Sequence, residues 1–489
     1  MSRDSSKPND ESTHGSETVH RSYSRRRFLQ VSIAGVAGVA LLAACGPAAA
    51  PAPTAAPAKP AAEPAKPVAE PAKPAEAAKP AAQAAPGGFA GGGSLKLLTR
   101  SHFVPAYDVW LDKWAAEWGT KNKVEVAVDH ILAAELPAKW AAEVAAGDGH
   151  DLFTFTQGGA INVYNKQLVD VSDLAKQFGD QHGGWVTPLA EQIGMFEGVW
   201  KGIPDFFIEF STEYRKDLFD ENGLQPPDTW GDLLKVGTIL KAKGNQIGIA
   251  INQKCNDANN SWTSLLWCYG ASYVAKDGKT AAINSPETRT SVTFALELYN
   301  KTMTNEVLSW DDTANNQLLA SGKGSWIHNP ISALRTIEKE NPELAKKIYV
   351  WNTPAGPAGR YASVGTSIWG IMNWSKNVAA AKAFLTDFYA VFIDAVKASE
   401  GYNQPLLKNF RKKPMPFIGE DPKYQILQDF DQAARVVGFP GPPTPAAAEV
   451  ETNWIIPLMV AQAVQSGGNV EDAVGWATQK VEAIYSKYK

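Results

Sequence analysis

The sequence predicts an α/β fold of two lobes behind a long N-terminal extension that has no core of its own. Three observations support this prediction. The chain has 489 residues, which is too long for a single hydrophobic core. Strand and helix patterns alternate from Leu95 onward, as they do in α/β proteins. Residues 1–93 carry targeting and low-complexity patterns instead, so the folded part is expected to start at Ser94.

The first elements of the folded part alternate between strand and helix. Strand patterns cover residues 95–99, 123–129 and 151–156, and helical spacing covers residues 108–118 and 136–146. This βαβαβ succession predicts a mostly parallel sheet with right-handed crossovers. Ligands of such sheets bind beyond the carboxyl ends of the strands, here near residues 100–103, His130 and residues 157–159.

Residues 201–234 predict a strand, a short helix, a proline turn and a long helix. The aromatic strand begins next to Pro204, and the short helix at 216–222 ends before Gly223, where a left-handed helix stop is expected. Thr229 and Asp232 have the spacing of a capping box for the next helix.

The N-terminus has the pattern of an export signal. Residues 24–30 read SRRRFLQ, a twin-arginine motif, and the apolar run at 31–42 follows. That run is shorter than the roughly 20 residues a spanning helix needs. It ends in LAAC at 42–45, which resembles the lipobox of bacterial lipoproteins. The resemblance implies a signal over residues 1–45, cleavage before Cys45 and lipidation of its thiol; the alternative is a plain signal anchor.

Residues 46–93 form a tether rich in Ala, Pro, Lys and Glu, with PAKP recurring and a glycine-rich joint at its end. Such a composition buries no core, and proline holds it extended. Its proline-rich part reaches on the order of 100 Å at full extension. The expected role is a semi-rigid stalk above a membrane surface.

Composition excludes several classes of function. The net charge of −4 argues against a nucleic-acid partner. Three cysteines build neither a disulfide framework nor a cysteine zinc cluster, although Cys255 and Cys268 are left open as a pair. The histidine spacing matches no metal motif. No nucleophile triad or phosphate loop stands out, so neither a metal, a cofactor nor a catalytic residue is expected.

Four segments of the folded part carry patterns of one family. They read GIPDFFIEFSTEYRKDLFDENGLQPPDTWGDLL from 202, NSPETRTSVTFALELY from 284, SGKGSWIHNPISAL from 321 and WSKNVAAAKAFLTDFY from 374. In this order they resemble the extracellular solute-binding proteins (family 1) of bacterial ABC importers, the group that includes maltodextrin-binding proteins. The resemblance covers nearly all of residues 95–489.

The resemblance implies a two-lobed, type II periplasmic-binding-protein-like fold with a multi-strand hinge and a ligand enclosed between the lobes. Carried over, lobe 1 is residues 94–204 plus 366–400, and lobe 2 is residues 205–365 plus 401–489. The chain then crosses the hinge three times, which permits rigid-body closure.

The resemblance also implies the ligand contacts, because a sugar cleft needs aromatic faces and planar polar groups. The expected contacts are His102, Gln157, Asp205, Phe206, Glu209, Trp262, Trp310, Asn329, Thr366, Ser367 and Trp369. Trp262 is expected to open a helix after a polar turn at 256–261. Core packing is the alternative for Phe206, and a structural role is the alternative for residues 366, 367 and 369. Ile208 departs from the family, which often has a polar residue there, so the particular sugar stays open.

The implied function is a non-catalytic, monomeric lipoprotein that captures a carbohydrate outside the cell and delivers it to an ABC permease. One alternative is the same fold for a polyol phosphate, a polyamine or a peptide; only Arg100 lies near a strand end, which disfavours a phosphate. The other is a surface glycan-degrading enzyme with Asp205 and Glu209 as its carboxylates, although both lie on one short segment.

Overall fold

The computed structural model describes residues 89–416, 418–419 and 421–489, all within one compact unit spanning Ala82–Lys489. The predicted signal, Cys45 and nearly all of the predicted tether lie outside the described residues. No helix in the described part is both long and apolar enough to cross a membrane.

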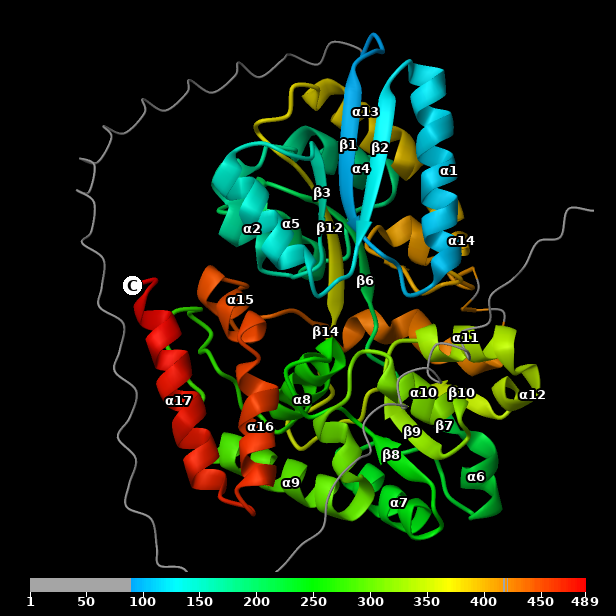
Figure 1. Cartoon of the computed structure of the whole chain (residues 1–489), viewed down its shortest axis with the longest axis vertical. Helices are drawn as coiled ribbons and strands as arrows, with labels where there is room; N and C mark the ends of the chain where they lie inside the picture. Colours follow the sequence, from blue (N-terminus) through cyan, green and yellow to red (C-terminus); the bar gives the residue numbers. More distant parts are fainter. Residues whose placement is uncertain (1–88, 417, 420) are drawn as a thin grey trace, which may run out of the picture. The chain divides into compact units, whose positions relative to one another are not determined.

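The elements follow one another as an α/β chain (Figure 1). The strands are β1 (Ser94–Arg100), β2 (Glu125–Ile131), β3 (Leu152–Phe155), β4 (Met195–Phe196), β5 (Val199–Trp200), β6 (Ile203–Ile208), β7 (Thr212–Arg215), β8 (Gln246–Gly248), β9 (Gly324–His328), β10 (Ile348–Trp351), β11 (Ala362–Ser363), β12 (Gly365–Ile371), β13 (Gln404–Pro405) and β14 (Ala434–Arg435). The α-helices are α1 (Pro105–Asn122), α2 (Leu136–Ala146), α3 (Ala160–Tyr164), α4 (Ser172–Gln181), α5 (Leu189–Gly194), α6 (Lys216–Glu221), α7 (Trp230–Ala242), α8 (Asn256–Cys268), α9 (Pro286–Thr302), α10 (Ala314–Ala320), α11 (Ser332–Glu340), α12 (Pro342–Ala345), α13 (Val378–Ala390), α14 (Phe392–Ala398), α15 (Pro445–Thr452), α16 (Ile455–Gln465) and α17 (Val470–Ser486). Short 3₁₀ helices are η2 (Asn165–Gln167), η3 (Asn305–Leu308), η4 (Lys408–Arg411) and η5 (Pro422–Gln432).

Two sheets, each with its own hydrophobic core, frame the fold. The larger sheet has the order β13-β6-β12-β3-β1-β2, and the smaller has the order β10-β7-β9-β8. The predicted parallel pairing holds for β1, β2 and β3. Strand β12 pairs antiparallel with both β3 and β6, and β13 pairs antiparallel with β6, so the larger sheet is mixed. We call these sheets with their helices the larger-sheet lobe and the smaller-sheet lobe.

Helices cover both faces of the larger sheet. Neighbouring residues of its strands point to opposite faces, and apolar side chains on each face pack against a helix. Trp369 of β12 packs against Phe388 of α13 on one face. Phe155 of β3, which pairs with the neighbouring residue of β12, packs against Trp140 of α2 on the other face. Figure 1 shows α1, α13 and α14 away from α2 across these strands. The central strands are therefore buried on both sides, as near-continuous apolar runs require.

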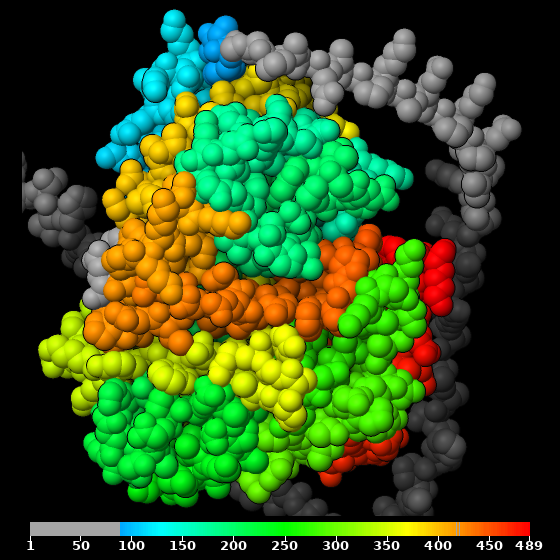
Figure 2. All heavy atoms as spheres, turned by 180° about the vertical axis from the view of Figure 1, so that it is seen from behind, coloured from blue at the N-terminus to red at the C-terminus, as the bar shows by residue number. Residues whose placement is uncertain are grey.

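The chain passes between the two sheets at several points. It leaves the larger sheet at Ile208 and joins the smaller sheet at Thr212, so Pro204 lies inside β6 rather than at a crossing. It returns through β12, and the two-residue strands β11 and β14 pair with each other near the last passage. Figure 2 shows the orange stretch around β14 between the two lobes. The lobe boundaries predicted from the sequence stay a prediction.

Several local predictions are confirmed by backbone geometry. Helix α2 has the predicted bounds, and Gly147 ends it with a φ of 65°. Thr229 caps α7 by accepting a hydrogen bond from the Asp232 backbone N–H at 3.0 Å. The expected start of a helix at Trp262 is wrong. Helix α8 begins at Asn256, so the polar residues 256–261 form its first turns instead of a preceding loop.

Candidate ligand-binding site

A cavity of about 330 Å³ lies between the two sheets and is lined from both lobes. This volume is within the roughly 300–1,000 Å³ of small-molecule sites. The lining residues are Arg100, Phe103, Ala133, Ala134, Pro137, Ala138, Thr156, Gln157, Gly158, Ile208, Phe210, Asn256, Asp257, Asn259, Asn260, Asp312, Asn316, Asn329, Pro330, Ser332, Val364, Gly365, Tyr402, Val437, Glu451, Thr452 and Trp454.

The larger-sheet wall forms where parallel strands end. Arg100 is the last residue of β1, and Gln157 and Gly158 follow β3. Because β1 and β3 pair in parallel, these ends meet at one edge of the sheet. The cavity therefore lies where the βαβαβ pattern predicts ligands.

The smaller-sheet wall carries amide side chains on the first turns of α8. Asn256, Asn259 and Asn260 are three and four residues apart, so they share one face of the helix. Asn259 donates to the Glu451 carbonyl at 3.1 Å, and Asn260 accepts from the Ser363 hydroxyl at 3.0 Å. These bonds fix the direction of the amides. Fixed amides offer both donors and acceptors to a hydroxylated ligand.

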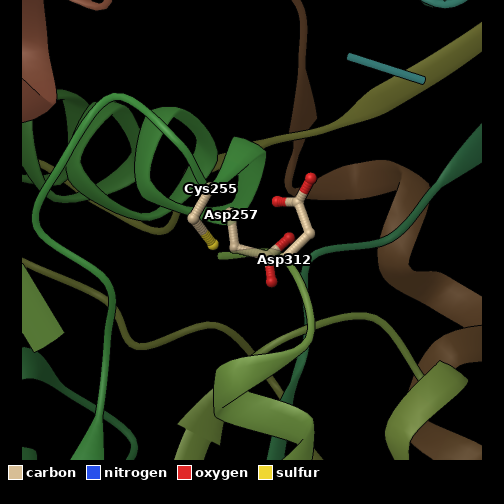
Figure 3. A group of neighbouring side chains, drawn as sticks. All are labelled: Cys255, Asp257 and Asp312. Atoms are coloured by element: carbon tan, nitrogen blue, oxygen red, sulfur yellow. The ribbon is translucent and has the colours of Figure 1, made fainter. Parts of the chain in front are cut away.

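Two carboxyls and a thiol meet at the start of α8 (Figure 3). One ligand atom from each of Cys255, Asp257 and Asp312 lies within 4.8 Å of the others. Burial raises the pKa of both carboxyls, and that of Asp257 is raised further by the charge of Asp312. Two carboxyls so close cannot both ionise easily, because each negative charge disfavours the other.

The same three groups are the best candidates for metal ligands in the described part, but their hydrogen bonds are already made. Asp257 accepts from the Asn315 amide at 2.7 Å, and Asp312 accepts from the Asn256 backbone N–H at 2.5 Å. Only three ligand atoms converge, with a buried thiol whose pKa burial raises. The arrangement fits a hydrogen-bonding surface for a ligand better than a metal cage.

Glu451, in the last turn of α15, and Trp454, directly before α16, both line the cavity. Trp454 has a φ of 57°, an unusual conformation for a bulky residue that marks strain or function. Its ring is only partly buried and lines the cavity. Burial raises the pKa of Glu451 to about 7. The end of α15 and the turn after it thus contribute a carboxyl group and an aromatic ring to the cavity wall.

The sequence also matches a known protein family. A sequence model of the bacterial extracellular solute-binding proteins matches residues 113–390, which is more than half of the chain. The chain belongs to this family.

One sequence relative and two solved structures are similar to this solute-binding protein. A binding protein of Brucella abortus (strain 2308) is 24% identical over 233 residues, 47% of this chain and 55% of that protein. The chain thus spans about half the length of the relatives it matches. An ABC transporter solute-binding protein from Thermotoga lettingae, bound with α-D-tagatose, has a TM-score of 0.69 at 19% identity and covers 80% of this chain and 100% of its own. A sugar transporter from Arthrobacter chlorophenolicus with bound laminaribiose has a TM-score of 0.70 at 17% identity, covering 80% and 99%. At such identities these structures support the two-lobed α/β fold.

Of the residues predicted to contact ligand, Gln157 and Asn329 line the cavity. Asn329 is held by its neighbours, because its side-chain oxygen accepts from Asn315 at 3.1 Å and its amide donates to the Pro330 carbonyl at 2.7 Å. Ser332 also lines the cavity. The turn after β9 of this solute-binding protein thus contributes polar side chains to the cavity wall.

A second group of predicted residues lies behind the larger-sheet wall. The Ser367 hydroxyl donates to the Asp205 carboxyl at 3.1 Å, and burial raises the pKa of Asp205 to about 7. Thr366 and Phe206 are buried beside them. His102 is also buried, bonds Asn403 through Nε2 at 2.9 Å, and has its pKa lowered to about 3 by burial. These groups support the wall without lining it.

The predicted tryptophans belong to the cores of the solute-binding protein. Trp262 is 1% exposed and donates its ring N–H to the Ala250 carbonyl at 2.7 Å. Trp267, on the same helix, is equally buried. Trp310 lies in the smaller-sheet core against Gly248, while Trp369 packs on α13. Cys255 and Cys268 are both free.

Glu209 lies off the cavity, at the hinge. Its side chain is completely buried, and burial raises its pKa well above the usual range while the charges of Arg335 and Arg411 oppose that shift. The glycan-degrading alternative relied on Glu209 and Asp205, and neither residue lines the cavity.

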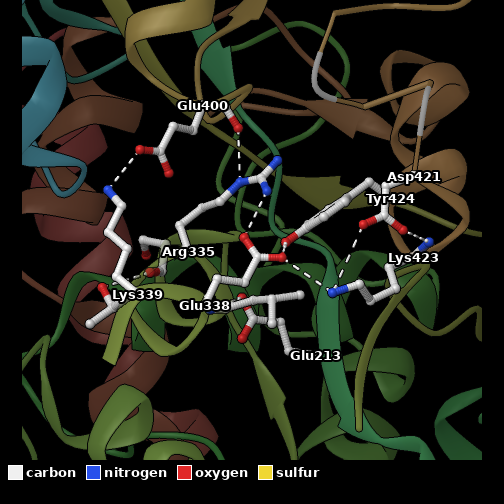
Figure 4. Close-up of polar contacts among 11 residues, drawn as sticks. Glu213, Arg335, Glu338, Lys339, Glu400, Asp421, Lys423 and Tyr424 are labelled. Carbon is white, nitrogen blue, oxygen red and sulfur yellow. Dashed lines mark hydrogen bonds and ion pairs between the residues drawn. The ribbon is translucent and has the colours of Figure 1, made fainter. Parts of the chain in front are cut away.

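Next to the hinge, α11 and η5 are joined by a charged network (Figure 4). Glu338 accepts from Arg335 at 2.8 Å and from the Tyr424 hydroxyl at 2.9 Å, and pairs with Lys423 at 3.2 Å. The Arg335 guanidinium carbon lies 4.0 Å from the Tyr424 ring centre, and its Nε donates to the Glu400 carbonyl at 2.9 Å. One carboxylate thus ties together segments far apart in the sequence.

Sequence reasoning missed Asp257, Asp312, Tyr402, Glu451 and Trp454 as wall residues. Their signal was weak because they come from four separate segments. One signal could have been detected in the sequence, the asparagine-rich start of α8. Buried amides at positions i, i+3 and i+4 of a helix are unusual unless they have hydrogen-bond partners.

Proposed function

We propose that this chain captures a carbohydrate between its two lobes and delivers it to the permease of an ABC transporter. The observation that carries the proposal is the cavity wall. The cavity is lined by oriented amides of α8, by Asn329 and Gln157, and by the partly exposed Trp454. Sugars need this combination, because their hydroxyls take hydrogen bonds and their C–H faces pack on aromatic rings. The similar proteins with bound tagatose and laminaribiose support the same ligand class.

Direct contacts are proposed for Gln157 and Asn329, with Trp454 as the stacking platform. The other predicted residues, among them Asp205, Phe206 and His102, would act by supporting the wall. Burial keeps His102 neutral and Asp205 partly protonated near pH 7, so these groups fit a rigid hydrogen-bonded backing. Binding then requires no covalent chemistry.

The proposed delivery of the ligand to a permease depends on movement of the two lobes about the hinge. The crossings between β6 and β7 and around β12 would let the lobes close on ligand as rigid bodies, with lobe boundaries near those expected from the sequence. A permease then needs only to distinguish the closed state from the open one. Signal cleavage before Cys45, a lipid on its thiol and a monomeric chain held to the cell membrane by the tether complete the proposal.

A thermal-shift screen tests the ligand class. The full chain is heated with mono- and oligosaccharides, polyols, polyamines and short peptides. A ligand at a hundredfold excess over its Kd adds about 2.7 kcal/mol of stability. We expect a carbohydrate to raise the melting temperature, and Asn329→Ala to abolish the shift. A shift with amines or peptides alone contradicts the carbohydrate assignment.

A further inference from the structure

Arg100 stands apart from the other charged groups of the cavity. It ends β1, lines the cavity and is 6% exposed. Arg215 and Arg335 are similarly buried, and each forms an ion pair at 2.8 Å, with Asp217 and Glu338. Within the described residues, no carboxylate lies within 4.0 Å of the Arg100 guanidinium. A buried charge without such a partner is costly.

Aromatic rings surround Arg100 in place of a counter-ion. Its guanidinium carbon lies 5.8 Å from the Phe103 ring, 5.4 Å from Phe206 and 5.7 Å from Tyr402. Such rings attract a cation and stabilise its charge, and the Arg100 side chain also hydrogen-bonds to the Tyr402 hydroxyl. Nε and Nη2 of Arg100 have no hydrogen-bond partner in the described part of the chain. These two groups share one edge of the guanidinium, the edge that binds a carboxylate with two parallel hydrogen bonds.

The neighbouring carboxyls do not balance this charge. Asp205 lies behind the wall, and burial raises its pKa to about 7 although Ser367 and Arg100 oppose the shift. Asp108, at the start of α1, has a pKa that burial also raises. On the opposite wall, burial raises the pKa of Asp257, Asp312 and Glu451. Burial thus favours the neutral form of these three carboxyls on the opposite wall.

We propose that Arg100 is the specificity-determining residue of the cavity and binds an oxyanion on the ligand. The inference rests on the proposed carbohydrate function and narrows it to acidic carbohydrates. A uronate or a sugar phosphate supplies the oxyanion, and its hydroxyls bond the amides of α8.

Titration calorimetry on the full chain compares matched ligands: glucuronate with glucose, galacturonate with galactose, and glucose 6-phosphate with glucose. Wild-type protein should bind at least one acidic ligand roughly ten- to a hundred-fold more tightly than its neutral match, the range that charged hydrogen bonds provide. Arg100→Gln should remove this preference, so that the acidic ligand binds no more tightly than its neutral match. Arg100→Lys should retain part of it, since lysine keeps the charge and loses the fork.

Arg289→Gln is the matched control, because Arg289 pairs with Glu471 on the surface and does not line the cavity. It should retain the wild-type preference. Equal or tighter binding of the neutral sugars overturns the role of Arg100 and leaves the proposed function intact. That comparison needs wild-type protein alone, so it stands even if a variant fails to fold. Binding of no sugar, acidic or neutral, overturns both.

Discussion

Trp454 and Trp262 differ in their surroundings, so one is expected to affect binding and the other stability. Its ring is partly exposed in the cavity and its backbone has a positive φ, whereas Trp262 is fully packed in the smaller-sheet core. A large aromatic in a wall contributes contact to a ligand, and one in a core contributes to folding. The two residue positions therefore predict opposite phenotypes.

Trp454→Ala should weaken sugar binding roughly tenfold or more and change the free energy of unfolding by about 1 kcal/mol or less. Trp262→Ala is the control and should cost about 3–5 kcal/mol of stability, since it leaves a core cavity. Calorimetry and urea unfolding measure the two effects. Comparable stability losses in both variants would return Trp454 to a structural role.

Glu451 makes stability depend on pH. Burial raises its folded-state pKa to about 7 from an ordinary value near 4.5, so the folded state binds this proton more tightly than the unfolded chain. The resulting stability is fully present below about pH 4.5 and is lost as pH rises through 7. Glu451→Gln should lose less stability than wild type between about pH 5 and 8 in urea titrations. Identical pH profiles would show that the carboxyl is already ionised in the folded state.

At the scale of elements, hydrogen bonds at helix ends hold the frame of the smaller-sheet lobe. The Thr229 hydroxyl accepts from the Asp232 backbone N–H and donates to the Asp232 carboxylate at 2.7 Å. Thr229→Ala should lower the free energy of unfolding by about 1 kcal/mol, because it exposes an unpaired N–H at the start of α7. Thr238→Ala, on the exposed side of the same helix, should be nearly neutral in chemical denaturation. Equal losses would contradict the cap.

The network between α11 and η5 is the second element-scale test. Glu338 accepts from three cationic or hydroxyl groups at once, so Glu338→Gln should lower stability by about 1–3 kcal/mol. Glu343→Gln removes an exposed ion pair with Lys346 and should leave stability nearly unchanged, because exposed pairs contribute little. Thermal unfolding of both variants gives the comparison. A neutral Glu338→Gln would mean that the network adds no net stability.

At the scale of the molecule, local patterns predicted local structure better than they predicted the cavity. Helix α2, the cap at Thr229 and the parallel strands β1–β3 follow from hydrophobic spacing and turn residues, which act over a few positions. The start of α8 was missed because its first turns are polar, and that polarity belongs to the cavity. The mixed order of the larger sheet depends on β12, some two hundred residues from β3, a pairing that no local pattern encodes.

The candidate site was predictable only where it touches a strand end or a motif. Gln157 and Arg100 lie at the ends of predicted strands, and Asn329 lies in a turn resembling the family. Asp312, Tyr402 and Trp454 reach the wall by tertiary packing. The tryptophans predicted to stack on ligand lie in the cores, because burial of their large apolar area stabilises the fold.

The most direct measurement of the central claim is a calorimetric titration of the full chain with the carbohydrate that gives the largest thermal shift. One molecule should bind per chain, saturably and without hydrolysis of the sugar, and the heat of binding should be lost in Asn329→Ala and reduced in Trp454→Ala. Unchanged binding in both variants would place the sugar outside this cavity and contradict the account.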